Sequence, residues 1–126
     1  MIIDNKRVIV KDSLFSPLSN DRKIYYVSNQ DKGRLYKVWI YLDGDGLSFV
    51  DHVIYKLHPS FKDPEKKVVR SISNPRCVLT IWTWGLFNIE VKIKFQTGET
   101  LKTNHYTTYD SDLNSDSQFM EQKSFV

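Results

Sequence analysis

The sequence predicts an all-β domain, and three features of its composition and pattern lead to that prediction. Alanine is absent from the 126 residues, whereas Tyr, Phe and Trp together make up 13% of them. Aromatic and β-branched side chains favour strands because they pack well on a half-buried, pleated surface. Short apolar runs also recur at regular spacing with turn residues between them, as in a β-sandwich or barrel. We therefore expect about eight strands in a single folding unit.

The first part of the chain contains three of the expected strands. Residues 7–10 and 23–27 form two of them, and the Ser-, Pro- and Asn-rich segment 13–21 is the loop between them. Residues 36–42 are apolar on both faces, which predicts a strand in the middle of a sheet. The Asp-Gly-Asp-Gly sequence at 43–46 then turns the chain, and a calcium loop is not expected because no closing glutamate follows.

The next strand is expected over residues 49–58, where the two faces separate by alternation. One face carries Val53, Tyr55 and Leu57, and the other carries His52, Ile54, Lys56 and His58. This alternation places His58 at the end of the strand. Shorter strands are expected at 68–72 and 77–82, divided by Asn74-Pro75.

The most regular alternation in the chain predicts a strand with one buried and one solvent-facing side over residues 87–96. The apolar side consists of Phe87, Ile89, Val91, Ile93 and Phe95. Thr97-Gly98 forms the next turn, and residues 101–109, rich in Thr and Tyr, are the returning antiparallel strand.

The chain therefore divides into three stretches. Residues 1–32 contribute N-terminal strands and a loop to the sandwich, residues 33–113 form its core, and residues 114–126 are expected to be a polar, disordered tail. Phe119 and Phe125 are the two aromatic side chains with which that tail can anchor itself weakly.

Charge and cysteine content limit the classes of partner. The net charge is only +3 with both signs interspersed, so nucleic acid is not an expected partner. The densest basic stretch, which holds Lys62, Lys66, Lys67 and Arg70, is interrupted by acidic residues and is interpreted as a solvated strand edge. Cys77 is the single cysteine and lies in an apolar run, which predicts a buried, inert thiol and a reducing compartment. No membrane-spanning stretch is visible, and a cytoplasmic location is expected.

The three histidines are the candidates for a catalytic or a metal site. His58 and Ser60 are close enough in sequence to suggest a hydrolase, but neither a strained nucleophile elbow nor a Gly-rich oxyanion loop is present. His52 and His58 share one face of their predicted strand and His105 lies on a later strand, so a metal site was considered, yet six residues of extended chain separate the first two by about 20 Å. We therefore expect a non-enzymatic domain with neither metal nor cofactor.

Aromatic and hydrogen-bonding side chains are instead concentrated in two predicted loops, a combination suited to an apolar ligand that carries an amide. The two segments read Leu57-His58-Pro59-Ser60-Phe61 and Trp84-Gly85-Leu86-Phe87. Together, in this strand context, they resemble the YEATS domain, and specifically its prokaryotic branch, over roughly residues 33–113. That resemblance implies an immunoglobulin-like antiparallel β-sandwich whose end loops bind an acylated lysine.

The resemblance also implies roles for individual residues. Phe61 and Trp84 would be the rings on either side of a flat acyl group, and Ser60 would hydrogen-bond its amide. His58 would line the pocket, Phe87 would form its apolar wall, and a backbone N–H beside Trp84, at Gly85, would bind the carbonyl oxygen. Tyr36 is a candidate for the aromatic cap. Thr83 stands where the family usually has a glycine before the loop aromatic.

Two functions follow. The first is a reader of acetyl- or crotonyl-type lysine in a protein or peptide. The alternative is an interaction or sensor module of a prokaryotic signalling or defence system that does not bind acyl-lysine. The sequence leaves the oligomeric state open, since exposed edge strands can pair between copies.

Overall fold

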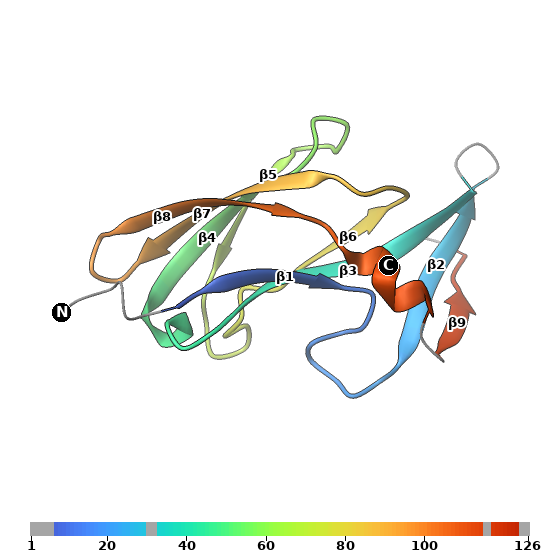
Figure 1. The fold of residues 1–126 in the computed structure, drawn as a ribbon, viewed down its shortest axis with the longest axis horizontal. Helices are drawn as coiled ribbons and strands as arrows, with labels where there is room; N and C mark the ends of the chain where they lie inside the picture. The colour runs from blue at the N-terminus through green and yellow to red at the C-terminus, as the bar shows by residue number, and fades with distance from the viewer. Residues whose placement is uncertain (1–6, 30–32, 115–116, 124–126) are drawn as a thin grey trace. The chain divides into compact units, whose positions relative to one another are not determined.

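A computed structural model of the chain describes residues 7–29, 33–114 and 117–123, and these residues form two β-sheets (Figure 1). The strands are β1 (Ile9–Ser13), β2 (Lys23–Asn29), β3 (Gly33–Asp43), β4 (Val50–Lys56), β5 (Glu65–Val69), β6 (Leu79–Thr83), β7 (Asn88–Phe95), β8 (Thr100–Tyr106) and β9 (Gln118–Glu121). Two short 3₁₀ turns accompany them, η2 (Leu47–Phe49) and η3 (Tyr109–Asn114). The all-β prediction is confirmed. In the described part of the chain, no helix has the length and apolar character needed to cross a membrane.

Each sheet has a simple strand order. One sheet runs β5-β4-β7-β8 and is antiparallel throughout. The other runs β1-β3-β2-β9, with β6 also paired to β3, and its β2–β9 pair is parallel. Because β3 pairs with several neighbours, the prediction that residues 36–42 lie in the middle of a sheet is confirmed.

The chain divides into two compact units. The first comprises residues 1–11, 41–79 and 87–107, and contains the β5-β4-β7-β8 sheet. The second comprises residues 12–40, 80–86 and 108–126, and contains β2, β6 and β9.

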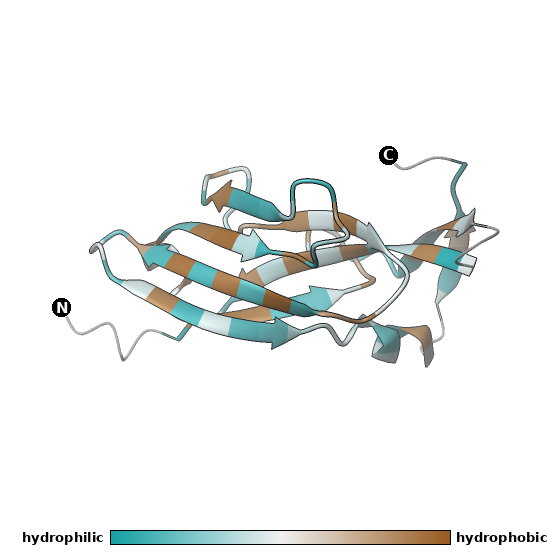
Figure 2. Ribbon diagram, turned by 90° about the horizontal axis from the view of Figure 1, so that it is seen from above, coloured by the Kyte–Doolittle hydropathy of each residue, from teal (hydrophilic) through white to brown (hydrophobic). Residues whose placement is uncertain are grey.

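In the first unit, side chains alternate between buried and exposed along β7, as its sequence predicts. Its inward residues Ile89, Val91 and Ile93 are at most 2% exposed. Val53 and Tyr55 on β4 are fully buried, and Figure 2 shows the same alternation as bands of brown and teal along the strands. The two predicted faces of this sheet are therefore confirmed.

The core of the first unit contains a polar contact at Cys77. The hydroxyl of fully buried Tyr55 donates a hydrogen bond to the Cys77 carbonyl oxygen at 2.8 Å. Cys77 adopts a left-handed backbone conformation with φ of 51°, which is uncommon for a residue other than glycine. Its thiol is buried, as predicted, and burial raises its pKa to about 11.

The turn after β3 depends on a glycine. Gly44 has φ of +116°, and a Cβ there would collide with the backbone carbonyl oxygen of Arg7. The same carbonyl accepts a hydrogen bond from Gly46 N–H at 2.9 Å, so the N-terminal segment lies directly against this turn. Beside it, Lys11 forms an ion pair with Asp43 at 3.2 Å.

Several strands lie a few residues from where the sequence placed them. β1 covers residues 9–13 rather than 7–10, and β8 covers residues 100–106 rather than 101–109. β5 begins at Glu65 rather than 68, because Leu57 N–H bonds to the Pro64 carbonyl at 2.8 Å and pairing starts directly after the loop. β6 begins at Leu79 rather than 77, because the Asn74 side chain bonds both Val78 N–H and its carbonyl and so holds residues 74–78 as a turn.

The second unit is rich in aromatic contacts. Tyr25 meets Trp39 edge-on with ring centroids 6.4 Å apart. The guanidinium of Arg34 lies 4.1 Å from the centre of the Tyr26 ring and 5.7 Å from that of Phe119. Such cation–π contacts favour the close approach of neighbouring strands.

The disordered tail expected over 114–126 requires a correction. Residues 118–121 form β9, which pairs in parallel with β2 from Lys23↔Gln118 to Tyr26↔Glu121. The Ser28 hydroxyl also donates to Glu121 at 2.6 Å, and Phe119 approaches Arg34 as an anchor should. Phe125, the other expected anchor, lies outside the described residues.

Candidate functional site

The loop between β4 and β5 carries the predicted residues His58, Ser60 and Phe61. It leaves the sheet at buried Leu57 and returns at Pro64, where the Leu57 N–H···O=C bond of 2.8 Å closes its base. A turn within it is closed by Phe61 N–H donating to the His58 carbonyl at 3.0 Å. These two backbone bonds fix a short exposed loop, with His58 and Ser60 in solvent and Phe61 half-buried.

His58 and Ser60 form a local hydrogen-bonded pair. Nδ1 of His58 accepts the backbone N–H of Ser60 at 3.1 Å and lies 2.8 Å from Ser60 Oγ. A ring nitrogen that accepts a backbone N–H carries no proton, so the Oγ–H is the donor in the shorter bond. Both lone pairs of Ser60 Oγ then remain to accept a hydrogen bond from a ligand.

Phe61 rests on Phe87, with ring centroids 5.3 Å apart and planes tilted by 44°. Phe87 is 8% exposed and precedes β7. Its N–H donates to the Thr107 hydroxyl at 3.0 Å, and its carbonyl accepts Thr107 N–H at 3.0 Å. Both backbone polar groups of Phe87 are therefore hydrogen-bonded to Thr107, and the Phe87 ring provides a fixed apolar support for Phe61.

Thr107 was not anticipated from the sequence. It is a buried polar residue, 1% exposed, just after β8. Its partner is the backbone of Phe87, 20 positions earlier in the chain, and single-sequence patterns carry no signal for that kind of pairing.

Trp84 and Gly85 belong to the second unit, in the loop that follows β6. The Trp84 side chain is 55% exposed, which is high for so large an apolar residue. Thr83 is 6% exposed, and its hydroxyl donates to the Gly85 carbonyl at 3.2 Å. Gly85 N–H lies 3.5 Å from the same hydroxyl oxygen. Thr83 therefore stabilises the turn at Trp84 and Gly85 through its hydroxyl group.

Tyr36, the candidate cap, lies on β3 within an aromatic cluster of the second unit. Its ring centroid is 6.4 Å from those of Tyr26 and Tyr109. Burial, followed by the charges of Asp110 and Asp12 and the neighbouring Tyr36, raises the pKa of Tyr109 to about 12. These contacts make Tyr36 part of the packing of its own unit.

The alternatives of catalysis and metal binding can be compared with the geometry. Within the described ranges, no carboxylate is hydrogen-bonded to His58, so the third member of a Ser-His-acid arrangement is missing there. His52 bonds instead to its neighbour Asp51 at 2.7 Å. Among the described residues, no group of three His, Cys, Asp or Glu side chains is close enough to hold a metal ion.

Comparison with solved structures places the fold. The structure described as the Yaf9 YEATS domain recognizing an H3K122suc peptide aligns with a TM-score of 0.53 and 16% identity, over 85% of this chain and 78% of that one. The yeast AF-9 homologue Yaf9 aligns with a TM-score of 0.53 and 19% identity, over 82% and 72% of the two chains. The predicted immunoglobulin-like fold class is therefore confirmed. A search of the curated proteins found no match.

The family is established by a sequence model rather than by these distant structures. The model of the prokaryotic YEATS domain matches residues 35–108, which include both loops described above and more than half of the chain. The resemblance found in the Leu57–Phe61 and Trp84–Phe87 segments is therefore confirmed, and the chain belongs to the prokaryotic YEATS domain family.

Proposed function

We propose that this domain is a non-catalytic reader of acylated lysine, with the loop between β4 and β5 as the centre of its binding site. Its similarity to YEATS domains supports a reader-like binding module in general. The observation that carries the finer proposal is the His58–Ser60 pair, because it orients a serine hydroxyl in an exposed loop.

The chemistry of an acyl-lysine amide suits that hydroxyl. The Ser60 hydroxyl donates a hydrogen bond to His58 Nδ1, so its oxygen is left as an acceptor for the amide N–H of the ligand. Unmodified lysine offers a charged ammonium group whose dehydration is costly, whereas the acylated side chain is neutral. The loop therefore favours the modified side chain over the unmodified one.

The aromatic residues supply the apolar part of the proposed site. Phe61 presents a ring supported by Phe87, and an acyl amide is planar and stacks on such faces. Trp84 is proposed as a second aromatic contact, as the family resemblance implies, and its side chain is 55% exposed. A relative of similar fold is described as recognizing a succinylated histone peptide, which supports a peptide as the partner.

The test is a titration of acetyl-, crotonyl- and succinyl-lysine peptides, followed by tryptophan fluorescence and calorimetry, with the unmodified peptide alongside. We expect saturable binding of at least one acylated peptide and none of the unmodified one. Ser60→Ala removes the acceptor and should weaken binding roughly tenfold, the effect of one lost hydrogen bond of about 1.4 kcal/mol. Trp84→Ala should weaken binding by at least as much.

Matched variants control for general effects. Ser73→Ala changes an exposed serine that bonds only another serine, and Tyr106→Ala removes an aromatic ring of similar exposure, 59%. Both should bind acylated peptide as wild type does. If no acylated peptide binds, the interaction or sensor module becomes the better account. If the protein hydrolyses the acyl group and Ser60→Ala abolishes turnover, the non-catalytic proposal is wrong.

A further inference from the structure

The solvent-facing side of the β5-β4-β7-β8 sheet carries an unusual distribution of charge. Pairing in register places Lys67, Ile54, Lys92 and Lys102 in one row across the four strands. The adjacent row holds Glu65, Lys56, Glu90 and Asn104. With Lys94 included, this face has five lysines and two glutamates, an excess of +3 (5 − 2) that equals the net charge of the whole chain.

The positive charges of Lys67, Lys92 and Lys102, here called the lysine row, are not neutralised by acidic side chains within the row. Lys92 and Lys102 are direct cross-strand partners, and like charges in that relation repel. The ion pair between Lys56 and Glu90, at 3.6 Å, engages a lysine of the other row. Within the described part of the chain, Lys67, Lys92 and Lys102 make no ion pair. Three uncompensated cations in line are a feature that an anionic ligand would stabilise.

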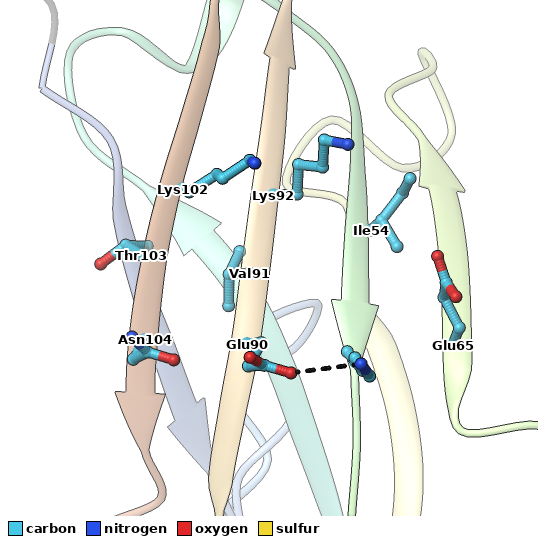
Figure 3. Close-up of a pocket in the computed structure, with 9 residues that line it drawn as sticks. Ile54, Glu65, Glu90, Val91, Lys92, Lys102, Thr103 and Asn104 are labelled. Atoms are coloured by element: carbon cyan, nitrogen blue, oxygen red, sulfur yellow. Dashed lines mark ion pairs between the residues drawn. The ribbon is translucent and has the colours of Figure 1, made fainter.

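A hollow accompanies this row. It has a volume of about 370 Å³ and lies over β4, β7 and β8, with Glu65 of β5 at its margin. Figure 3 shows Lys92 and Lys102 side by side on neighbouring strands, with Ile54 between Lys92 and the β5 side. The short Ile54 side chain interrupts the row of long lysines, and this explains why the face is hollowed there.

The dimensions and chemistry indicate which anion fits. From Lys67 to Lys102 the row crosses three strand spacings, about 14 Å, which exceeds the span of one phosphate group. Glu90 and Asn104 in the adjacent row are hydrogen-bond acceptors, suited to the amino groups of nucleobases. Tyr106, on the same face opposite Asn88, is 59% exposed and offers a stacking surface.

We propose that this sheet face binds single-stranded nucleic acid, with the backbone phosphates along Lys67, Lys92 and Lys102 and the bases toward Glu90, Asn104 and Tyr106. A flexible single strand can direct its phosphates to the lysines and away from the glutamates. A double helix or an anionic membrane presents negative charge over the whole contact and would meet Glu65 and Glu90 as well. The inference concerns a surface other than the loop proposed to bind acyl-lysine.

The experiment measures fluorescence anisotropy of labelled oligothymidylate and oligouridylate of about 15 nucleotides, at about 50 mM salt and above. We expect wild type to bind both, with affinity falling as salt rises. Lys92→Gln/Lys102→Gln should weaken binding about tenfold and reduce the slope of log K against log salt by about 1.4, the value for two phosphate contacts to a single strand. Circular dichroism verifies the fold, which loss of the repulsive pair should not harm.

The control Lys62→Gln/Lys123→Gln removes the same charge from exposed positions elsewhere and should change the affinity less than twofold. An equal loss in both pairs would reduce the effect to net charge and overturn the proposal. So would the absence of oligonucleotide binding, tighter binding of duplex DNA, or binding only to phosphatidylglycerol vesicles. The acyl-peptide titration uses wild type and the Ser60 and Trp84 variants, and none of these changes the lysine row, so either proposal can fail alone.

Discussion

At the scale of single residues, Tyr109 shows how packing changes the behaviour of an ionisable group. Its side chain is 4% exposed, next to Tyr36, and burial with two nearby carboxylates raises its pKa to about 12 from an ordinary 10.0. Burial raises the pKa of Tyr55 in the first unit as well. Both phenols are therefore held neutral in the folded protein at pH values where they would ionise in the unfolded chain.

This difference predicts a loss of stability in alkaline solution. Because the folded-state pKa of Tyr109 is raised, its contribution is complete below pH 10 and is lost as the pH rises toward 12. Urea unfolding at a series of pH values, with tyrosinate absorbance as a second signal, measures the effect. Tyr109→Phe should remove part of the pH dependence. An unchanged dependence in that variant would show that Tyr109 ionises normally in the folded state.

At this scale the sequence predicted the residues of the candidate site but not the residue that supports them. The parity of the strand placed His58 at its end, and the structure has it directly after β4 and Leu57. The bond between Ser60 and His58 was within reach of sequence reasoning because the two residues are close in the chain. Thr107 was not, since its bond to Phe87 joins residues 20 positions apart.

At the scale of elements, the turn after β3 imposes the strictest local requirement. Gly44 combines a positive φ with close contact to the Arg7 carbonyl, whereas Gly98 has a positive φ of 96° in open space. Both glycines therefore have a positive φ that disfavours a side chain, and only Gly44 also lacks room for a Cβ.

Replacing each glycine by alanine separates those contributions. Gly98→Ala should lower the free energy of unfolding by about 1 kcal/mol, the effect of a left-handed conformation alone. Gly44→Ala should lower it by roughly 2 kcal/mol more, because the backbone of Arg7 must move as well. Urea denaturation monitored by circular dichroism gives both values, and equal losses would indicate that the N-terminal segment is free to move aside.

Elements with strong periodicity were predictable, and those formed by other means were not. β7 alternates along its whole length, so its faces could be assigned from the sequence. β9 has four exposed residues and no alternation, because backbone pairing with β2 holds it rather than an apolar face. β6 likewise begins later in the sequence than its apolar residues predicted, because the Asn74 side chain bonds to the backbone of Val78.

At the scale of the whole molecule, segments far apart in sequence are joined within the second unit. Asp112 accepts hydrogen bonds from the Ser13 hydroxyl at 3.0 Å and from Leu14 N–H at 2.9 Å, across 99 and 98 residues of sequence. Asp12 accepts Thr108 N–H at 3.0 Å nearby. The segment after β8 is thereby fixed to the end of β1 and to Leu14, which follows it.

Removing this connection should affect stability more than removing a neighbouring charge. Asp112→Ala leaves two donors without their carboxylate and should lower the free energy of unfolding by about 1 to 3 kcal/mol. Asp110→Ala, an exposed carboxylate two positions away, is the control and should change it by less than about 0.5 kcal/mol. Thermal and urea unfolding measure both, and a small effect at Asp112 would mean that the Asp12–Thr108 bonds and β9 suffice to hold this part of the chain.

The global distribution of charge could not be obtained from the linear sequence. Lys67 lies in the densest basic stretch of the sequence, but Lys92 and Lys102 lie far from it along the chain, so no single stretch contains all three lysines. Strand register brings them into one row. The fold class and the family, by contrast, could be predicted from short local sequence patterns, because these patterns can be recognised without knowing the order of the strands.

The buried thiol of Cys77 has a practical consequence for site-specific labelling. A thiol with a pKa of about 11 and no exposure is almost entirely protonated and inaccessible near neutral pH, so maleimide reagents should spare it in the folded protein. A fluorophore can then be attached at one engineered cysteine without first replacing the native one. Ile72, which is fully exposed between β5 and β6, is a suitable position for Ile72→Cys, and the labelled protein could report peptide and oligonucleotide binding with the same dye.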